Sequence, residues 1–443
     1  MEHDSSKKIN NKKKRLATFT LGCKVNQYET AAIEKIFIKG GYDIVPFESE
    51  ADIYLINTCT VTSIADRKSR QMIRRAKSKN PDAKVIVTGC YSQENPELIL
   101  KMDEVNLVMG TTDKGEIFSQ AEKLKNTDKI NLTRDVFEEK EFEDIDKAGL
   151  NIDHTRAFIK VQDGCDRYCS YCIIPYTRGR VRSKKPESVI SEVTALAENG
   201  FKEIVLTGIH LSSYGKDLKT VKLIDLIERL DKINGIERIR LGSLEPRLID
   251  DEFLARAAKA KKFCPNFHLS LQSGSGSVLK RMNRKYTPEQ FRIAVCKIRQ
   301  TWEDPIITTD VIVGFPGETD EEFLETYEFL KEIKFYYTHI FKYSRRKGTP
   351  AYDMPAQISP DIKHARSTEL IKLCDQNKSE FEKNLTGKEL RVLFEERNGD
   401  YISGHSFNFV KVSCKTEEDL TGKILKIKIT GADEKIGVYG EIE

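Results

Sequence analysis

The sequence predicts an α/β protein, because strand-like and helix-like segments alternate in two long regions of the chain. From residue 16 to about residue 125, short apolar runs alternate with helical stretches, and the same alternation resumes from about residue 156 to residue 345. Strands that alternate with helices form parallel sheets with right-handed crossovers. We therefore expect an N-terminal parallel sheet domain, followed by a second α/β domain that is built in the same way.

The first region contains three strand candidates and two helix candidates. The helical stretches are Tyr28 to Ile38 and Ile64 to Ser78. The apolar runs, which we interpret as parallel strands, are Ala17–Leu21, Ile53–Ile56 and Val85–Val87. Residues 128–146 then carry eight acids against three bases, which is typical of a linker or a loosely packed segment.

The second region contains six strand candidates, which predict a partial barrel of βα units with its active face at the carboxyl ends of the strands. Capping sequences begin two of its helices, at Thr287 with Gln290 and at Thr319 with Glu322. The predicted strands are Ala157–Val161, Glu203–Thr207, Arg238–Gly242, Phe267–Leu271, Thr309–Val313 and Tyr337–Phe341.

A small β-barrel of the oligonucleotide-binding kind is expected at the C-terminus. It follows a helix over residues 360–384 and has turns at Asn398-Gly399 and at Gly431. Its expected strands are Glu389–Glu395, Val410–Val412, Ile424–Ile429 and Gly437–Glu441.

Length and composition limit the classes of protein to which this chain can belong. A chain of 443 residues exceeds one ordinary core, and no apolar run reaches the roughly 18 residues of a membrane span. Met1 to Arg15 is rich in lysine and has no apolar core, unlike a secretory signal. We expect a cytoplasmic protein with no membrane partner. The net charge of +4 is too small to imply a nucleic-acid partner by itself.

Three closely spaced cysteines, Cys165, Cys169 and Cys172, indicate a metal centre. One loop can fold three thiolates around such a centre. A structural zinc site requires four ligands, and no fourth cysteine lies nearby. A cubane cluster held by three cysteines instead keeps one iron open for another ligand. An incomplete zinc site or a chance spacing is the alternative.

A second set of three cysteines closes three predicted parallel strands, at Cys23, Cys59 and Cys90. The carboxyl ends of neighbouring parallel strands converge on one crevice, so these thiols can hold a second cluster. The alternative is three small buried residues, since free cysteine is among the most buried types. The other four cysteines have no ligand spacing and are expected to be buried thiols: Cys264, Cys296, Cys374 and Cys414.

The Cys-x3-Cys-x2-Cys loop after the first strand of a βα domain resembles the radical S-adenosylmethionine (SAM) superfamily. The resemblance implies that Cys165, Cys169 and Cys172 bind a 4Fe–4S cluster whose open iron chelates SAM, and that reductive cleavage of SAM gives a 5′-deoxyadenosyl radical. It also implies that Tyr171 packs against the adenine.

The two triads in this order resemble the methylthiotransferase family, which implies a second 4Fe–4S cluster on Cys23, Cys59 and Cys90. The resemblance covers nearly the whole chain. The stretches that carry it include Gly22-Cys-Lys-Val-Asn26, Asn57-Thr-Cys59, Thr88-Gly-Cys90, Ser243-Leu-Glu-Pro246, His268 to Ser275, Met282 to Tyr286 and Asp310 to Glu318. The implied division is a cluster domain over residues 14–126, an acidic linker over 127–150, a radical SAM core over 151–380 and a TRAM RNA-binding domain over 383–443.

Residues at or just beyond the barrel strand ends resemble those that line the SAM pocket in this family. Each can instead be a helix cap or a partner in a buried ion pair. They are Glu245, Gln272, Ser273, Arg284 and Asp310. The turn Gly314 to Gly317 is either a ligand turn or a plain βα turn. Arg178, Arg180 and Arg182 contact phosphate or the SAM carboxylate, or form a solvated basic face.

Two further features are candidates for RNA contact. Phe407 and Phe409 in the TRAM-like tail can stack on bases or pack in the core. Seven cations on or near one helix can contact phosphate or form a solvated face: Arg67, Lys68, Arg70, Arg74, Arg75, Lys77 and Lys79.

The family resemblance implies that one SAM methylates sulfur on the N-terminal cluster, and that a second SAM supplies the radical that opens an unreactive C–H bond. Leu21 to Thr30 looks most like the branch that acts on N6-threonylcarbamoyladenosine beside the tRNA anticodon. The implied partners are the anticodon stem-loop and a low-potential electron donor such as flavodoxin or ferredoxin. Other branches act on isopentenyladenosine in tRNA or on an aspartate of a ribosomal protein. Two alternatives belong to other functional classes: a redox protein with two clusters, and a zinc-dependent RNA-binding module.

Overall fold

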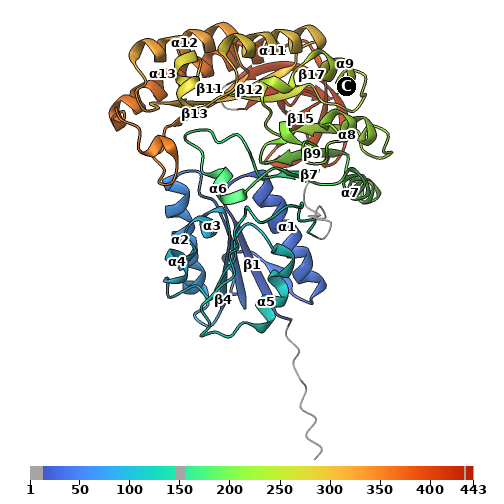
Figure 1. Ribbon diagram of the computed structural model, residues 1–443. Coiled ribbons are helices and arrows are strands. Elements are labelled where there is room, and N and C mark those ends of the chain that lie inside the picture. Colours follow the sequence, from blue (N-terminus) through green and yellow to red (C-terminus); the bar gives the residue numbers. More distant parts are fainter. Residues whose placement is uncertain (1–12, 146–154, 434–435, 443) are drawn as a thin grey trace, which may run out of the picture. The chain divides into compact units, whose positions relative to one another are not determined.

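A computed structural model describes residues 13–145, 155–433 and 436–442 of the chain (Figure 1). These residues form two compact units, of which the first contains the described residues up to 135, except 61–63, together with residue 145. The second contains residues 61–63, 136–144 and the described residues from 155 onward. Residues 1–12 lie outside the described residues, and so do the end of the predicted linker 127–150 and the start of the predicted core 151–380. The predicted domain boundaries stay predictions.

The first unit contains the predicted parallel sheet, which has six strands rather than the three that the sequence analysis identified. Its strand order is β2-β1-β3-β4-β5-β6. The bounds are β1 Arg15–Thr20, β2 Asp43–Val45, β3 Ile53–Thr58, β4 Lys84–Gly89, β5 Leu107–Val108 and β6 Ile130–Asn131. The order reverses between β1 and β3, and in open α/β sheets ligands bind outside the carboxyl ends of the strands at such a switch point.

Helices cover both faces of this sheet (Figure 1). Helices α1 (Lys24–Lys39) and α5 (Ile117–Lys123), with the 3-10 turn η1 (Lys114–Glu116), lie on one face. Helices α2 (Ser63–Lys79), α3 (Cys90–Glu94) and α4 (Pro96–Leu100) lie on the other. Every residue of β3 is buried, because a parallel strand with helices on both sides has no solvated face.

The second unit contains the six predicted parallel strands of the partial barrel. They form a sheet of order β10-β9-β7-β8 and a sheet of order β11-β12-β13, which the bridge Leu244–Leu269 joins. The bounds are β7 Arg156–Asp163, β8 Arg182–Ser183 (short and antiparallel), β9 Glu203–Gly208, β10 Arg238–Leu241, β11 Asn266–Gln272, β12 Ile306–Val313 and β13 Tyr337–Lys342.

Helices and the apolar side of the strands form the core of this unit. Phe267, Leu269 and Leu271 of β11 pack into that core, so His268 and Ser270 lie on the opposite, inner face of the barrel. Both predicted capping boxes are confirmed, at Thr287 and at Thr319. The helices are α6 Ile174–Arg178, α7 Pro186–Glu198, α8 Leu223–Leu230, α9 Asp251–Ala257, α10 Gly276–Arg281, α11 Pro288–Thr301, α12 Asp320–Ile333 and α13 Pro360–Lys383, with 3-10 turns η2 Leu211–Ser213, η3 Pro246–Leu248 and η4 Pro350–Tyr352.

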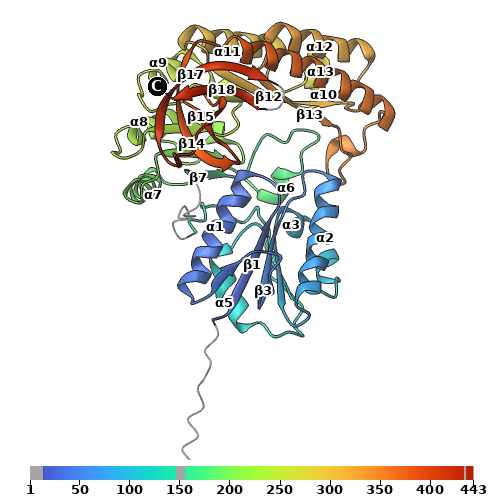
Figure 2. The ribbon, with the colours of Figure 1, turned by 180° about the vertical axis from the view of Figure 1, so that it is seen from behind.

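The C-terminal residues form a closed barrel of order β14-β15-β16-β18-β17 (Figure 2). Its strands are β14 Glu389–Asn398, β15 Tyr401–Ser406, β16 Lys411–Lys415, β17 Ile424–Asp433 and β18 Gly437–Ile442. The sequence analysis missed β15. It was also wrong about a turn at Gly431, because β17 continues to Asp433 with a register shift between Ile429 and Gly431.

Buried arginines join this C-terminal barrel to the inner face of the central barrel. The Arg238 guanidinium donates hydrogen bonds to the carbonyls of His405 (2.8 Å) and Arg391 (2.7 Å). Glu203 of β9 supplies the counter-charge, since its carboxylate accepts from Arg240 at 2.9 Å. The two barrels are therefore held together by hydrogen bonds of buried, charged side chains, and loss of one partner would leave the other buried and unpaired.

Candidate active site

The cysteines of the first triad lie on one loop that follows β7. Within the loop, the Cys165 N–H donates to the carbonyl of Gly179 (3.0 Å) and the Cys172 N–H donates to that of Cys169 (2.9 Å). Cys165 and Cys169 are buried and Cys172 is partly exposed. Burial, helped by the neighbouring Cys169 thiol, raises the pKa of Cys165 to about 11 and that of Cys172 to about 12. Because a metal centre binds thiolates, loading of this loop must release protons.

The start of the loop is fixed by Asp163 and Gly164. The Gly164 N–H donates to Asp163 Oδ1 (2.8 Å), while Asp163 Oδ2 pairs with Lys160 Nζ (2.5 Å) and Arg178 Nη1 (3.2 Å). Burial opposes ionisation of Asp163, but the charges of these cations and of Arg182 hold the pKa of its carboxyl well below its usual range. Arg178 and Arg182 are thus buried partners of Asp163 rather than a solvated basic face, and Arg180 alone of the three is exposed.

Gly164 has no room for a side chain. Its φ is +70°, and a Cβ there would lie 1.8 Å from the carbonyl oxygen of Arg180. Only glycine reaches this conformation without strain and allows the two segments of the loop to approach this closely.

Arg284 and Glu245, two of the predicted pocket residues, lie next to the cysteine loop. Arg284 Nη1 lies 3.2 Å from Cys169 Sγ, and Arg284 Nη2 lies 3.7 Å from Glu245 Oε1. The Tyr286 ring and hydroxyl hold the guanidinium in place, with the hydroxyl 2.9 Å from Arg284 Nε. Tyr171 packs partly buried beside Val278, Met282 and Phe315.

Two residues that the sequence analysis did not single out, Arg167 and His210, complete the surroundings of Glu245. Arg167 Nη2 and His210 Nε2 lie 2.5 Å and 3.6 Å from its two carboxylate oxygens. Burial alone would raise the pKa of Glu245, but the His210 contact and the charges of Arg284 and Arg167 lower it to about 2. Arg167 lies inside the cysteine motif, so its position was a usable signal, whereas nothing in the sequence around His210 marked it.

The other predicted pocket residues do not all join this group. Gln272 lies at a bulge of β11 with φ +71°, and Asp310 Oδ2 pairs with His268 Nε2 at 3.0 Å on the inner face. Ser273 is fully buried and its hydroxyl bonds to Thr326 of α12 (3.1 Å). At the Gly314 turn, the Gly314 N–H donates to Glu318 Oε2 (2.6 Å), as in a plain βα turn.

The second cysteine triad follows β1, β3 and β4 at the carboxyl edge of the first sheet. Cys23 caps α1 and is exposed, Cys59 follows β3, and Cys90 begins α3. These three strands are neighbours in the sheet and flank its switch point.

Close packing at this edge depends on two glycines. A Cβ at Gly22 would lie 2.9 Å from Cys59 Sγ, so the Cys23 turn rests against Cys59. A Cβ at Gly89 would lie 2.4 Å from the carbonyl oxygen of Thr58, so the Cys90 turn rests against the end of β3. Both glycines have φ near +100°, a conformation that other residues rarely adopt.

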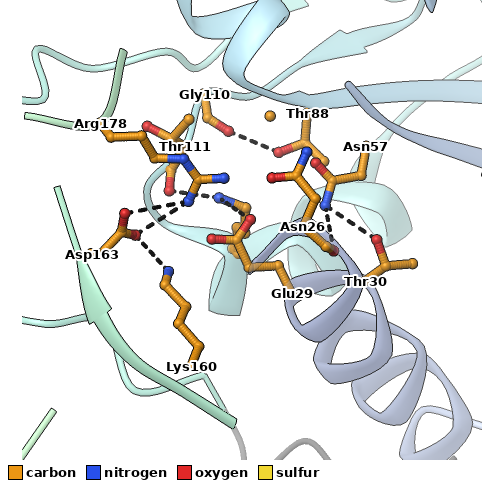
Figure 3. Close-up of polar contacts among 12 residues, drawn as sticks. Asn26, Glu29, Thr30, Asn57, Thr88, Gly110, Thr111, Lys160, Asp163 and Arg178 are labelled. Carbon is orange, nitrogen blue, oxygen red and sulfur yellow. Dashed lines mark hydrogen bonds and ion pairs between the residues drawn. The ribbon is translucent and has the colours of Figure 1, made fainter. Parts of the chain in front are cut away.

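Asparagine and threonine side chains tie the same strand ends together (Figure 3). Asn26 Nδ2 donates to the carbonyls of Leu21 (2.8 Å) and Thr58 (3.0 Å), and Asn57 Nδ2 donates to the Asn26 carbonyl (3.0 Å). Thr88 Oγ1 donates to the carbonyl of Gly110 (2.8 Å), as drawn in Figure 3. Hydrogen bonds from side chains other than the cysteines therefore hold this edge together.

Both donor sets fit iron–sulfur chemistry. Each offers three cysteines that form no disulfide, as a cluster with one open iron requires, and Arg284 places a positive charge beside Cys169. The four cysteines without ligand spacing differ among themselves. Cys264, Cys374 and Cys414 are buried as expected, but Cys296 is exposed on α11, so that expectation was wrong for Cys296.

The proposed RNA contacts on α2 and on the C-terminal barrel have partly intramolecular roles. Arg75 Nη2 and Lys79 Nζ pair with Glu48 at 2.7 and 3.0 Å, and Arg70 donates to the Tyr91 hydroxyl at 2.6 Å. Arg67, Lys68 and Arg74 are exposed on the same helix. Phe409 packs against Arg240, with 4.7 Å between guanidinium and ring centre, which is the core-packing alternative.

Comparison with known proteins covers the segments that carry both cysteine triads. Residues 159–330 match the radical SAM superfamily, and residues 15–110 match uncharacterized protein family UPF0004. Threonylcarbamoyladenosine tRNA methylthiotransferase MtaB of Bacillus subtilis is 43% identical over 94% of each chain. The chain belongs to the radical SAM methylthiotransferases.

Other relatives of this methylthiotransferase carry two different names. The Aquifex aeolicus MtaB is 46% identical over 87% of this chain and 93% of its own, and the Clostridium novyi tRNA-2-methylthio-N(6)-dimethylallyladenosine synthase is 34% identical over 99% and 98%. Among solved structures, the radical SAM methyltransferase TsrM of Kitasatospora setae is similar at a TM-score of 0.58 and 16% identity, covering 77% of each chain. At that identity the likeness bears on the fold alone. Within the described residues, no helix has the length and apolar character needed to cross a bilayer.

Proposed function

We propose that this methylthiotransferase converts N6-threonylcarbamoyladenosine beside the tRNA anticodon to its 2-methylthio derivative. The observation that carries the choice of substrate is the 43% and 46% identity to two enzymes named for threonylcarbamoyladenosine, against 34% to one named for dimethylallyladenosine. A cytoplasmic location, contact with the anticodon stem-loop and a flavodoxin or ferredoxin as electron donor belong to the same proposal.

Two 4Fe–4S clusters are part of this proposal, with Cys165, Cys169 and Cys172 as ligands of the first. These three residues would hold the first cluster, which would supply the electron for reductive cleavage of SAM. Radical chemistry suits the reaction because carbon 2 of the adenine carries no acidic proton that a general base could remove. Cys23, Cys59 and Cys90 are the proposed ligands of the second cluster.

Residues around the first loop would bind and orient SAM. The low pKa of Glu245 keeps its carboxylate charged at neutral pH, so it can accept hydrogen bonds from the ammonium group of SAM. Arg284 stands 3.2 Å from Cys169, where a guanidinium can bind the SAM carboxylate and stabilise the negative charge of the thiolates. Tyr171 supplies an aromatic surface for the adenine.

The experiment that tests the proposal is reaction of the reconstituted protein with an anticodon stem-loop that carries N6-threonylcarbamoyladenosine. With SAM, a sulfur source and a low-potential reductant, mass spectrometry of the nucleosides is expected to show replacement of one hydrogen by CH3S. Cys23→Ala and Cys165→Ala should each abolish that product. The exposed Cys296, which lies outside both triads, provides the matched control Cys296→Ala, which should retain it.

The same experiment distinguishes the roles of the two cysteine triads. Cys165→Ala should also abolish formation of 5′-deoxyadenosine, whereas Cys23→Ala should leave that cleavage in place, since the second triad is not needed to generate the radical. Product formation by either triad variant would contradict the ligand assignment. Modification of an isopentenyladenosine stem-loop, with none of the threonylcarbamoyl substrate, would contradict the choice of substrate.

A further inference from the structure

Three rings lie in a row on one face of β13, the last strand of the order β11-β12-β13. Thr338 and Ile340 face the helix layer, because Thr338 is buried and Ile340 packs against the main core. The alternate residues Tyr337, His339 and Phe341 face the inner side of the barrel. Tyr337 is 41% and Phe341 47% exposed, so two large rings remain in solvent at the edge of the sheet.

The rings of this ladder contact one another. The ring centres of Tyr337 and His339 are 4.7 Å apart, and those of His339 and Phe341 are 6.3 Å apart with an angle of 26° between the planes. An exposed apolar edge strand is a liability for a protein unless it has a use, since it invites aggregation. A row of rings with open faces is the surface on which nucleobases stack.

Hydrogen-bonding groups flank the ladder on the same face. Asp310 of β12 is paired in register with His339, and His268 of β11 lies next to both, with 5.9 Å between the two imidazole ring centres. His268, Asp310 and His339 bring one nitrogen or oxygen each within 4.8 Å of one another, which is the spacing of a metal site. Both His268 nitrogens, however, are engaged within the chain, with Thr308 at 2.9 Å and Asp310 at 3.0 Å.

Cations follow the ladder directly. Lys342 is the last residue of β13, Arg345 and Lys347 follow within five residues, and all three are exposed. A row of aromatic rings beside a group of exposed cations is the combination that binds single-stranded nucleic acid, because the rings take the bases and the cations take the phosphates.

We propose that the inner face of β13, formed by Tyr337, His339 and Phe341 with Asp310 beside them, is the platform on which the target adenosine and its neighbouring base stack. The inference rests on the proposed function, since it takes an unpaired tRNA loop as the ligand. Tyr337 and Phe341 position the bases. His339 and Asp310 place polar side chains beside the position of the polar substituent on N6 of the adenine.

The test uses cluster-loaded protein and a fluorescent anticodon stem-loop that carries N6-threonylcarbamoyladenosine. Phe341→Leu and Tyr337→Leu keep an apolar side chain but remove the ring, and each should weaken binding by about 5- to 150-fold, the factor that corresponds to one base–aromatic stack. Phe341→Tyr keeps the ring and should restore binding to within a few-fold of the native protein. Leu324→Ala removes an exposed apolar side chain from α12 and is the matched control.

Turnover measured on the same proteins separates positioning from folding. The Leu variants should raise KM for the stem-loop far more than they lower kcat, with iron content equal to that of the native protein. If native protein binds and modifies the stem-loop and both Leu variants do so equally well, the platform is wrong and the proposed function stands. If native protein neither binds nor modifies this RNA, the proposed function fails first, and the platform as written fails with it.

Discussion

Arg240 and Glu203 form a two-point ion pair inside the central barrel. Arg240 Nε lies 2.9 Å from Glu203 Oε1, and Arg240 Nη2 lies 3.2 Å from Glu203 Oε2. The same guanidinium donates to the carbonyls of Ser406 (2.8 Å) and Phe407 (2.9 Å) in the C-terminal barrel. One buried side chain therefore connects the central strands to the C-terminal barrel, and the Glu203 carboxylate balances its charge.

Glu203→Gln is expected to lower the free energy of unfolding by about 3–5 kcal/mol, because Arg156, Arg238 and Arg240 would lose their shared buried counter-charge. Urea unfolding followed by circular dichroism measures the change. Glu187→Gln, which breaks an exposed pair with Arg229, should have little effect. Equal stability of both variants would show that the buried pair does not hold the barrels together.

Gly164→Ala is expected to prevent assembly of the first cluster, since the new Cβ would overlap the Arg180 carbonyl and move Cys165. Iron and sulfide analysis after reconstitution should give roughly half the native content, because the second triad is unaffected. Gly200→Ala is a matched control: its φ is +86° but nothing lies within 4 Å of its Cβ position, so it should cost only about 1–2 kcal/mol of stability and no iron. Full iron content in Gly164→Ala would refute this role for the glycine.

Glu245 gives the protein a pH dependence whose sign follows from its lowered pKa. Its ordinary pKa is 4.5 and its folded pKa is about 2, so its contribution to stability is complete above pH 4.5 and is lost as the pH falls toward 2. The contribution is about 3 kcal/mol. Unfolding of cluster-free protein between pH 5 and pH 2.5 measures it, and Glu245→Gln should flatten that part of the profile. An unchanged slope in Glu245→Gln would mean that other carboxylates dominate acid unfolding.

Sequence pattern alone identified the parts of the fold whose signal is local. Strand β3 is a continuous apolar run, and the capping residues Thr287 and Thr319 each begin a helix as predicted. The position of a cysteine within three residues of the end of each of β1, β3 and β4 was visible in the same way, because a strand end and the residues that follow it are close in sequence.

Features that depend on tertiary contacts were not visible. Strand β15 contains Gly404 and several polar residues, and it is a strand because the closed barrel pairs it with β14 and β16. Phe409 was a candidate base-stacking residue, yet it packs on Arg240, whose buried position no local pattern reveals. The grouping of His268, Asp310 and His339 likewise requires three strands to lie in register.

The most direct test of the central claim is nucleoside mass spectrometry of tRNA from a strain that lacks this protein, before and after complementation. The account predicts that 2-methylthio-N6-threonylcarbamoyladenosine disappears, returns with the native gene and with Cys296→Ala, and does not return with Cys23→Ala or Cys165→Ala. Unchanged levels of that nucleoside in the deletion strain would contradict the account, and loss of the isopentenyl analogue in the same data would identify the substrate instead.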